Sequence, residues 1–196
     1  MKKDIILSGV GGQGILSIAT IIGEAATSAG ISLKQAEVHG MSQRGGDVQS
    51  NLRLSDEEIY SDLIAQGEAD IIISMEPMEA LRYLPYLRKD GWVITSSNPF
   101  KNISNYPDEV VLAEELDKLP HIAKLAIEDM AKENNMPKCA NVILLGMAAR
   151  FIGIVSPEQL RESIGRVFAA KGEAIVEMNE KAFDIGFDAV NEWNGK

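Results

Sequence analysis

The glycines near the start of the sequence are the residues best suited to bind a reactant. They follow the apolar run Asp4–Ser8 directly and precede a helical pattern that begins at Ile15. Peptide N–H groups at a helix start, with no Cβ to hold a ligand away, suit phosphate or carboxylate. The alternative is a tight turn that serves only packing, but a turn needs about one or two glycines. The candidate binding residues of this segment are Gly9, Gly11, Gly12, Gln13 and Gly14.

A second polar segment consists of Ser42, Gln43 and Arg44, followed by two glycines. An arginine beside hydroxyl and amide donors presents a planar guanidinium to a phosphate or carboxylate. From the residue types alone, a surface arginine at the entry to a hairpin is an equally good interpretation. We therefore take these three residues as further candidates for anion binding.

The remaining reactive side chains form no recognisable catalytic set. His39 and His121 each lack a partner that the sequence identifies, and Cys139 opens an apolar helix, so all three are interpreted as structural. Glu76 directly precedes Pro77, and we interpret its carboxylate as a negative charge at the start of a helix. The predicted role of the chain is therefore binding rather than proton transfer.

Composition limits the function further. The 196 residues are 45% hydrophobic and 24% charged, which is typical of one globular domain, predicted to span residues 1–196. A net charge of -10 argues against a nucleic-acid partner. The single cysteine excludes an internal disulfide and a cysteine-ligated iron–sulfur cluster. No segment is apolar and long enough for a membrane span, and no secretory signal is recognisable, so we expect a cytoplasmic protein.

The first elements follow from periodicity. A strand at Asp4–Ser8, a helix from Ile15 to Gly30 and a strand at Leu33–Val38 resemble a dinucleotide-binding unit, with Glu37 near the place of a ribose-binding acid. The alternating run Asp47–Leu54 then predicts a hairpin. Its expected turn is Ser55–Asp56 and its expected partner is Glu58–Tyr60.

The rest of the chain completes an α/β domain. We expect strands at Asp70–Met75, Gly91–Ser96 and Glu109–Leu112, and helices from Pro77 and at 121–134, 140–152, from 157, and 174–193. The predicted fold is a Rossmann-like three-layer domain: a mixed, mostly parallel sheet with an antiparallel hairpin and a helical C-terminal third. Because ligands lie beyond the carboxyl ends of parallel strands, the glycine segment, Met75–Glu76 and Ser96–Asn98 should share one crevice.

Five segments together resemble the gamma-type domain of the 2-oxoacid:ferredoxin oxidoreductase family. The run from Glu79 to Pro85 is most similar to the beta subunits of the indolepyruvate branch. The resemblance covers nearly the whole chain, in order. Its segments are Gly9–Leu16, Gly40–Gly46, Val48–Arg53, Ser74–Pro85 and Asn179–Gly186.

This resemblance implies a subunit of a complex that decarboxylates an aryl pyruvate oxidatively with coenzyme A, giving an acyl-CoA, carbon dioxide and reduced ferredoxin. Thiamine diphosphate, Mg²⁺ and [4Fe–4S] clusters would lie in a large alpha subunit, and this chain alone would bind no cofactor and be inactive. The glycines and Arg44 would position an anion, either coenzyme A or the oxoacid.

Two other functions are compatible with the glycine loop. A free-standing NAD(P)-dependent oxidoreductase would use the loop and Glu37, but the predicted hairpin replaces its second nucleotide-binding half. A non-catalytic nucleotide-binding scaffold would keep the loop without any reaction. The sequence does not choose between binding at the loop and a loop that only shapes a subunit contact.

Overall fold

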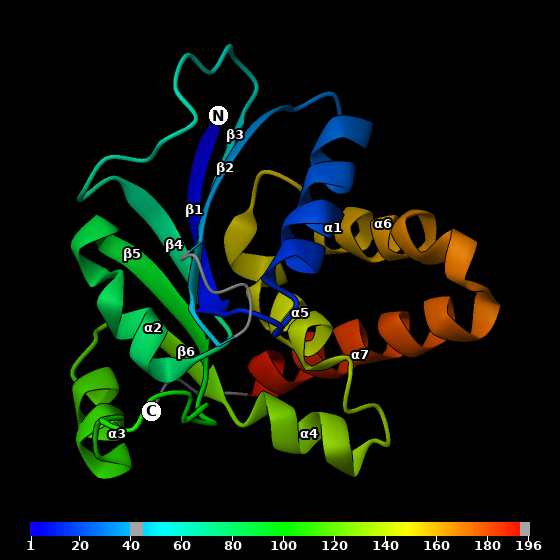
Figure 1. The fold of residues 1–196 in the computed structure, drawn as a ribbon. Coiled ribbons are helices and arrows are strands. Elements are labelled where there is room, and N and C mark those ends of the chain that lie inside the picture. Colours follow the sequence, from blue (N-terminus) through cyan, green and yellow to red (C-terminus); the bar gives the residue numbers. More distant parts are fainter. Residues whose placement is uncertain (40–44, 193–196) are drawn as a thin grey trace.

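The computed structural model describes residues 1–39 and 45–192, without the side chains of His39, Asn191 and Glu192. Within these ranges the strands form one sheet in the order β2-β3-β1-β4-β5-β6 (Figure 1). Neighbours β1, β4, β5 and β6 are parallel, whereas β3 is antiparallel to both β1 and β2. The strands are β1 (Lys2–Val10), β2 (Ser32–His39), β3 (Asp47–Ser55), β4 (Ala69–Ser74), β5 (Leu87–Ser96) and β6 (Ile122–Leu125).

Helices cover both faces of the sheet and make the domain three-layered (Figure 1). One face carries α1, α5, α6 and α7 over the larger apolar core, and the opposite face carries α2 and α3 over a smaller one. The α-helices are α1 (Ile15–Ser28), α2 (Pro77–Arg82), α3 (Glu109–Asp117), α4 (Ile127–Glu133), α5 (Ala140–Ile152), α6 (Pro157–Phe168) and α7 (Glu173–Glu192). Short 3₁₀ turns occupy Leu84–Tyr86 and Ala169–Lys171.

Local sequence explains the main helices. Helix α1 is buried over most of its circumference because it lies between the sheet and α6. Helix α5 has the bounds predicted from the sequence, and nearly all of its residues are buried. Helix α6 begins with a capping box in which Ser156 accepts from the Gln159 N–H and Gln159 accepts from the Ser156 N–H.

The predicted hairpin is correct in one strand and wrong in its partner. Strand β3 matches the alternating run, but it pairs with β2 through eight residue pairs and with β1 through nine, so it lies inside the sheet. Glu58–Tyr60 form no strand. They belong to a loop that Arg53 Nη1 holds by donating to the carbonyls of Ser61 and Leu63, at 2.9 and 3.1 Å.

Two further predictions are wrong. Glu109–Leu112 were predicted as a strand but lie in helix α3, because Asp108 accepts from the N–H groups of Val110 and Val111 and caps the helix. The two valines have strand propensity, but their side chains are exposed on the helix. Residues 121–134 were predicted to form one helix. Their first part is strand β6, whose four residues pair with β5, and helix α4 begins only after it. A four-residue strand is too short for periodicity to reveal.

No helix in the described ranges has the length and apolar composition needed to cross a bilayer.

Candidate functional site

The glycine loop links β1 to α1 through two left-handed residues. Gly12 has φ +103° and Gly14, the N-cap of α1, has φ +84°. No acceptor among the described residues receives the N–H of Gly12 or Gly14. The start of α1 therefore offers backbone donors, together with the positive end of the helix dipole, to a ligand.

Gly9 and Gln13 support the loop from within. Gly9 lies inside β1, and a Cβ there would stand 2.9 Å from Ile15 Cδ1 and 3.1 Å from Met75 Cβ, so this glycine permits close packing of helix and strand. Gln13 Oε1 accepts from the Val10 N–H at 2.7 Å, and its Nε2 lies 3.4 Å from the Met75 carbonyl oxygen. The Gln13 side-chain amide, which was predicted to bind a ligand, therefore stabilises the glycine loop through these contacts.

The second glycine-rich segment adjoins the first. The Gly11 N–H donates to the Gly46 carbonyl at 2.8 Å, and the Gly45 N–H lies 3.4 Å from the Gly11 carbonyl oxygen. Asn102 Nδ2 donates to the Gly45 carbonyl at 2.7 Å and so ties loop 98–108 to the same place. The predicted binding residues Ser42, Gln43 and Arg44 lie outside the described residues.

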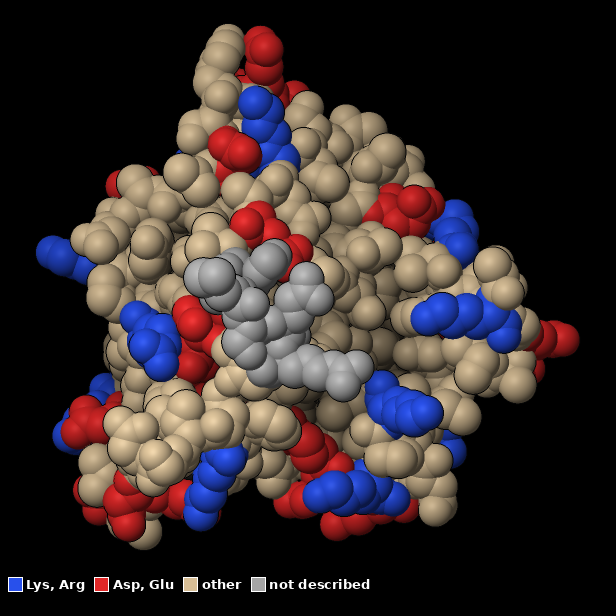
Figure 2. Space-filling model, viewed as in Figure 1, with Lys and Arg blue, Asp and Glu red and all other residues tan. Residues whose placement is uncertain are grey.

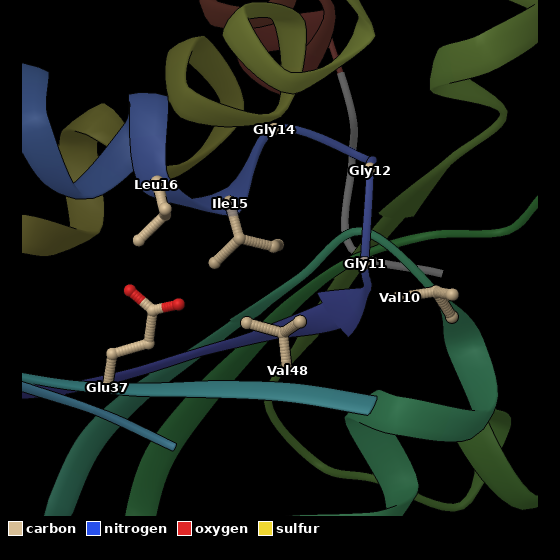
Figure 3. Close-up of a pocket in the computed structure, with 8 residues that line it drawn as sticks. All are labelled: Val10, Gly11, Gly12, Gly14, Ile15, Leu16, Glu37 and Val48. Atoms are coloured by element: carbon tan, nitrogen blue, oxygen red, sulfur yellow. The ribbon is translucent and has the colours of Figure 1, made fainter. Parts of the chain in front are cut away.

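One cavity, of about 480 Å³, lies between the glycine loop, α1 and the strands β2 and β3. Figure 3 shows the Glu37 carboxylate directed toward Ile15 and Leu16, with Val48 beside it. Glu37 is the one charged side chain among the described residues that line this cavity. The lining residues are Val10, Gly11, Gly12, Gly14, Ile15, Leu16, Glu37 and Val48.

A second cavity, of about 440 Å³, lies on the other side of the glycine loop, where α1 and α5 begin. Lys138 and Asn141 at the start of α5 line it, and Asn141 Nδ2 donates to the Gly14 carbonyl at 3.1 Å. Ser17, Phe100 and Glu128 also line it. Lys138 and Asn141 were not predicted as site residues, because 127 residues separate Gly14 from Asn141 and no local pattern links them. Ser17, in the first turn of α1, was not predicted either.

The carboxyl ends of β4 and β5 meet beside this second cavity, and the predicted crevice is confirmed in part. Met75 lines the cavity together with the glycine loop, whereas Ser96 and Asn98 adjoin it through hydrogen bonds to Glu128, and Glu76 is not among its described lining residues. Ser96 Oγ donates to Glu128 Oε2 at 2.6 Å, and the Glu128 N–H donates to Asn98 Oδ1 at 3.1 Å. Burial raises the pKa of Glu128 above its usual range, although the Ser96 hydroxyl opposes this. Glu76 caps α2 by accepting from the Glu79 N–H at 2.9 Å, as expected of a charge at a helix start.

The other reactive side chains are engaged in packing. The Cys139 thiol is buried, and burial raises its pKa. The His121 ring lies 5.3 Å from the Trp92 ring. Within the described ranges no three His, Cys, Asp or Glu side chains are grouped so that they could hold a metal ion.

Comparison with known families decides what kind of chain this is. The family profile for pyruvate ferredoxin/flavodoxin oxidoreductase matches residues 4–189. The chain belongs to this family.

Relatives of the same length within the oxidoreductase family have the names of subunits. The indolepyruvate oxidoreductase subunit IorB of Thermococcus kodakarensis is 37% identical over 205 residues, with 100% of both chains covered. IorB of Archaeoglobus fulgidus is 33% identical, covering 96% of this chain and 95% of the relative. The 2-oxoglutarate synthase subunit KorC of Methanocaldococcus jannaschii is 28% identical, with 98% and 96% covered. The predicted resemblance is confirmed, since homologues are subunits of 2-oxoacid oxidoreductase complexes.

Solved structures of oxidoreductase subunits share the fold. The gamma subunit of a keto/oxoacid ferredoxin oxidoreductase from Geobacter sulfurreducens is 25% identical, with a TM-score of 0.71 over 97% of this chain and 99% of that one. A 2-oxoglutarate:ferredoxin oxidoreductase from Magnetococcus marinus, with 2-oxoglutarate, coenzyme A and succinyl-CoA bound, is 20% identical. It has a TM-score of 0.73 over 100% of this chain and 32% of that longer one. The predicted α/β fold class is therefore confirmed.

Proposed function

We propose that this chain is the subunit without thiamine diphosphate and iron–sulfur clusters in a cytoplasmic complex that oxidises indolepyruvate or a related aryl pyruvate. The reaction cleaves the bond to the carboxylate and releases carbon dioxide. The electron pair left behind passes to oxidised ferredoxin, and the acyl group forms a thioester with coenzyme A, whose thiol proton is released. Membership of the oxidoreductase family and identity to IorB relatives over their full length support this proposal.

The groups that carry this chemistry belong, in the proposal, to a large alpha subunit. Thiamine diphosphate with Mg²⁺ supplies the carbanion chemistry there, and [4Fe–4S] clusters carry the electrons to ferredoxin. With a single cysteine, this chain cannot supply the about four thiolates of such a cluster. The chain alone is therefore expected to be inactive.

The proposed contribution of this chain is to position an anionic reactant at the glycine loop. The N–H groups of Gly12 and Gly14 have no acceptor among the described residues, and Lys138 lines the cavity on the α5 side of the loop. Phosphate or carboxylate is stabilised at such a helix start, most strongly where a cation lies nearby. The guanidinium of Arg44 is proposed to act on the same anion, as its sequence context suggests.

The observation that carries the proposal is the family match across residues 4–189, and purification from native extract tests it. The full chain should co-purify with a large subunit that contains thiamine diphosphate and iron–sulfur clusters. The pair should reduce ferredoxin with indolepyruvate and coenzyme A, whereas the chain alone should not. Turnover of any 2-oxoacid by the chain alone, or purification of the chain from native extract without such a partner, would contradict the proposal.

Arg44→Ala in the assembled complex tests the anion role separately. We expect a higher apparent KM for coenzyme A or for the oxoacid, with assembly unchanged. If both KM values stay at the wild-type value, Arg44 has no part in binding.

A further inference from the structure

The two cavities beside the glycine loop differ in charge, and this difference indicates which part of a ligand each can hold. The cavity near α5 has the Lys138 ammonium, the amide of Asn141 and the carboxyl group of Glu128, which accepts a hydrogen bond from Ser96 Oγ. The cavity near β2 has the carboxylate of Glu37 as its one charged group among the described lining residues. A ligand that lies across the loop therefore meets a cation only on the α5 side.

Glu37 is free to act on a ligand. It is exposed, and no Lys or Arg in the described ranges forms an ion pair with it. A carboxylate accepts hydrogen bonds and donates none, so atoms that contact it must donate and must carry no negative charge. Like-charge repulsion disfavours a phosphate beside Glu37, where no cation among the described lining residues offsets it.

The position of Glu37 differs from that of the acid in a dinucleotide-binding fold. There the acid ends the strand beside the glycine-loop strand and binds a ribose. Here β3 lies between β2 and β1, and the Val48 side chain forms part of the cavity wall between Glu37 and the loop (Figure 3). The described lining has no aromatic side chain on which a base could stack. Apart from the Glu37 carboxylate, the described side chains that line this cavity are apolar.

Coenzyme A has two ends of opposite character. The adenosine end carries phosphates at the ribose and in the diphosphate, whereas the pantetheine arm is uncharged and has amide N–H and hydroxyl donors among apolar carbons. The arm has the donors and the neutrality that Glu37 requires. The adenine amino group is also a neutral donor, but among the described lining residues the base would have no aromatic side chain on which to stack. A volume of about 480 Å³ is also within the usual range of small-molecule pockets.

We infer that the Glu37 cavity holds the pantetheine arm of coenzyme A, while the phosphates lie at the glycine loop toward Lys138. This inference rests on the proposed function, because it takes coenzyme A as the ligand of the loop. Glu37 accepts hydrogen bonds from the arm, and Ile15, Leu16 and Val48 contact its apolar carbons. The acid thereby fixes the direction in which the coenzyme crosses the loop.

Binding of the two halves of the coenzyme to the full chain and to the assembled complex tests the inference. Calorimetric titrations with pantetheine and with adenosine 3′,5′-bisphosphate would compare the wild type, Glu37→Gln and Glu37→Lys. Glu114→Lys, on the exposed surface of α3, makes the same charge change away from the loop and is the matched control. Circular dichroism and thermal unfolding would check that each variant is folded.

We expect Glu37→Lys to weaken pantetheine binding about tenfold or more, since hydrogen bonds to a charged group are lost. Glu37→Gln should weaken it less. Binding of the bisphosphate should stay equal or become tighter in both variants, and Glu114→Lys should change neither ligand.

Unchanged pantetheine affinity in Glu37→Lys would overturn the inference, and so would a wild type that binds the bisphosphate but no pantetheine. Neither result bears on the proposed function, which is tested separately by the reduction of ferredoxin by the complex. If neither half binds and the complex is inactive with coenzyme A, the proposed function fails as well.

Discussion

Gly186 of α7 lies directly against the backbone carbonyl of Ile143 in α5, so that a Cβ at residue 186 would stand 2.8 Å from the carbonyl carbon and closer still to its oxygen. Gly146 of α5 lies in the same way against the Phe183 carbonyl of α7. The two helices therefore touch through their backbones, and the glycines are required for this packing.

We expect Gly186→Ala to lower the free energy of unfolding by about 3 kcal/mol or more, because the added methyl meets backbone that cannot rotate away. Urea denaturation measures this. Gly165→Ala in α6 is the control, since its Cβ would find only ordinary contact, 3.7 Å from Glu180 Oε1. That variant should gain about 0.5–1 kcal/mol from helix propensity. Equal stabilities of the two variants would contradict the close helix contact.

Gly12→Ala separates backbone strain from ligand binding. Gly12 has φ +103° and no neighbour within 4 Å of an added Cβ, and Gly172, far from the loop in sequence, has φ +96° and equal space. Both substitutions should cost about 1–3 kcal/mol of stability, because alanine at a positive φ is strained. Only Gly12→Ala should raise the KM for coenzyme A in the assembled complex. A similar rise in Gly172→Ala would mean that lost stability, and not the loop, controls binding.

Arg53 holds a buried carboxylate and a loop at once. Its Nε and Nη2 donate to Asp4 at 2.9 and 3.2 Å, and Asp4 is fully buried. Arg53→Ala should lower the free energy of unfolding by about 3 kcal/mol, because the carboxylate keeps only the Lys2 ammonium. It should also speed proteolysis within residues 56–63. Lys118→Ala, which breaks the exposed pair with Glu115, should leave the denaturation midpoint nearly unchanged.

Glu128 should make stability depend on pH. Burial raises its pKa in the folded state, so its proton binds more tightly there than in the unfolded chain. The resulting stabilisation is complete below the ordinary glutamate pKa and is lost as pH rises through the raised value. Glu128→Gln should therefore gain stability relative to the wild type as pH rises from 4 to 7, measured by urea denaturation. Glu133→Gln, exposed on the same helix, should follow the wild type at each pH. A constant difference between Glu128→Gln and the wild type would contradict this cause.

The sequence predicted the elements whose signals are local. The glycines before Ile15, the capping box at Ser156 and the apolar run from Ala140 to Ile152 each determine their own structure. The position of Met75 beside the glycine loop followed from the direction of the parallel strands, whereas the contact of Gly11 with Gly46 was not predicted. These parts of the site could be predicted because short-range geometry and strand direction control them.

The remaining features depend on contacts between distant residues. The partners of β3 are set by pairing with two strands along its whole length, which Asp47–Leu54 alone cannot reveal. Lys138 and Asn141 reach the loop only because α5 packs beside α1. Val110 and Val111 favour a strand by propensity, and the Asp108 cap together with the burial of Leu112 and Leu116 overrides it.

The place of β3 in the sheet also orders the assembly of the chain during synthesis. Strands β2 and β3 are close in sequence, so their antiparallel pairing closes a short loop at small entropic cost. The parallel partner of β1 begins only at Ala69, and β5 and β6 emerge later still. Nucleation should therefore start at the β2–β3 ribbon and extend to β1, leaving the slower long-range strands to condense last. The half of the sheet that carries Glu37 would be formed while the rest of the polypeptide is still leaving the ribosome.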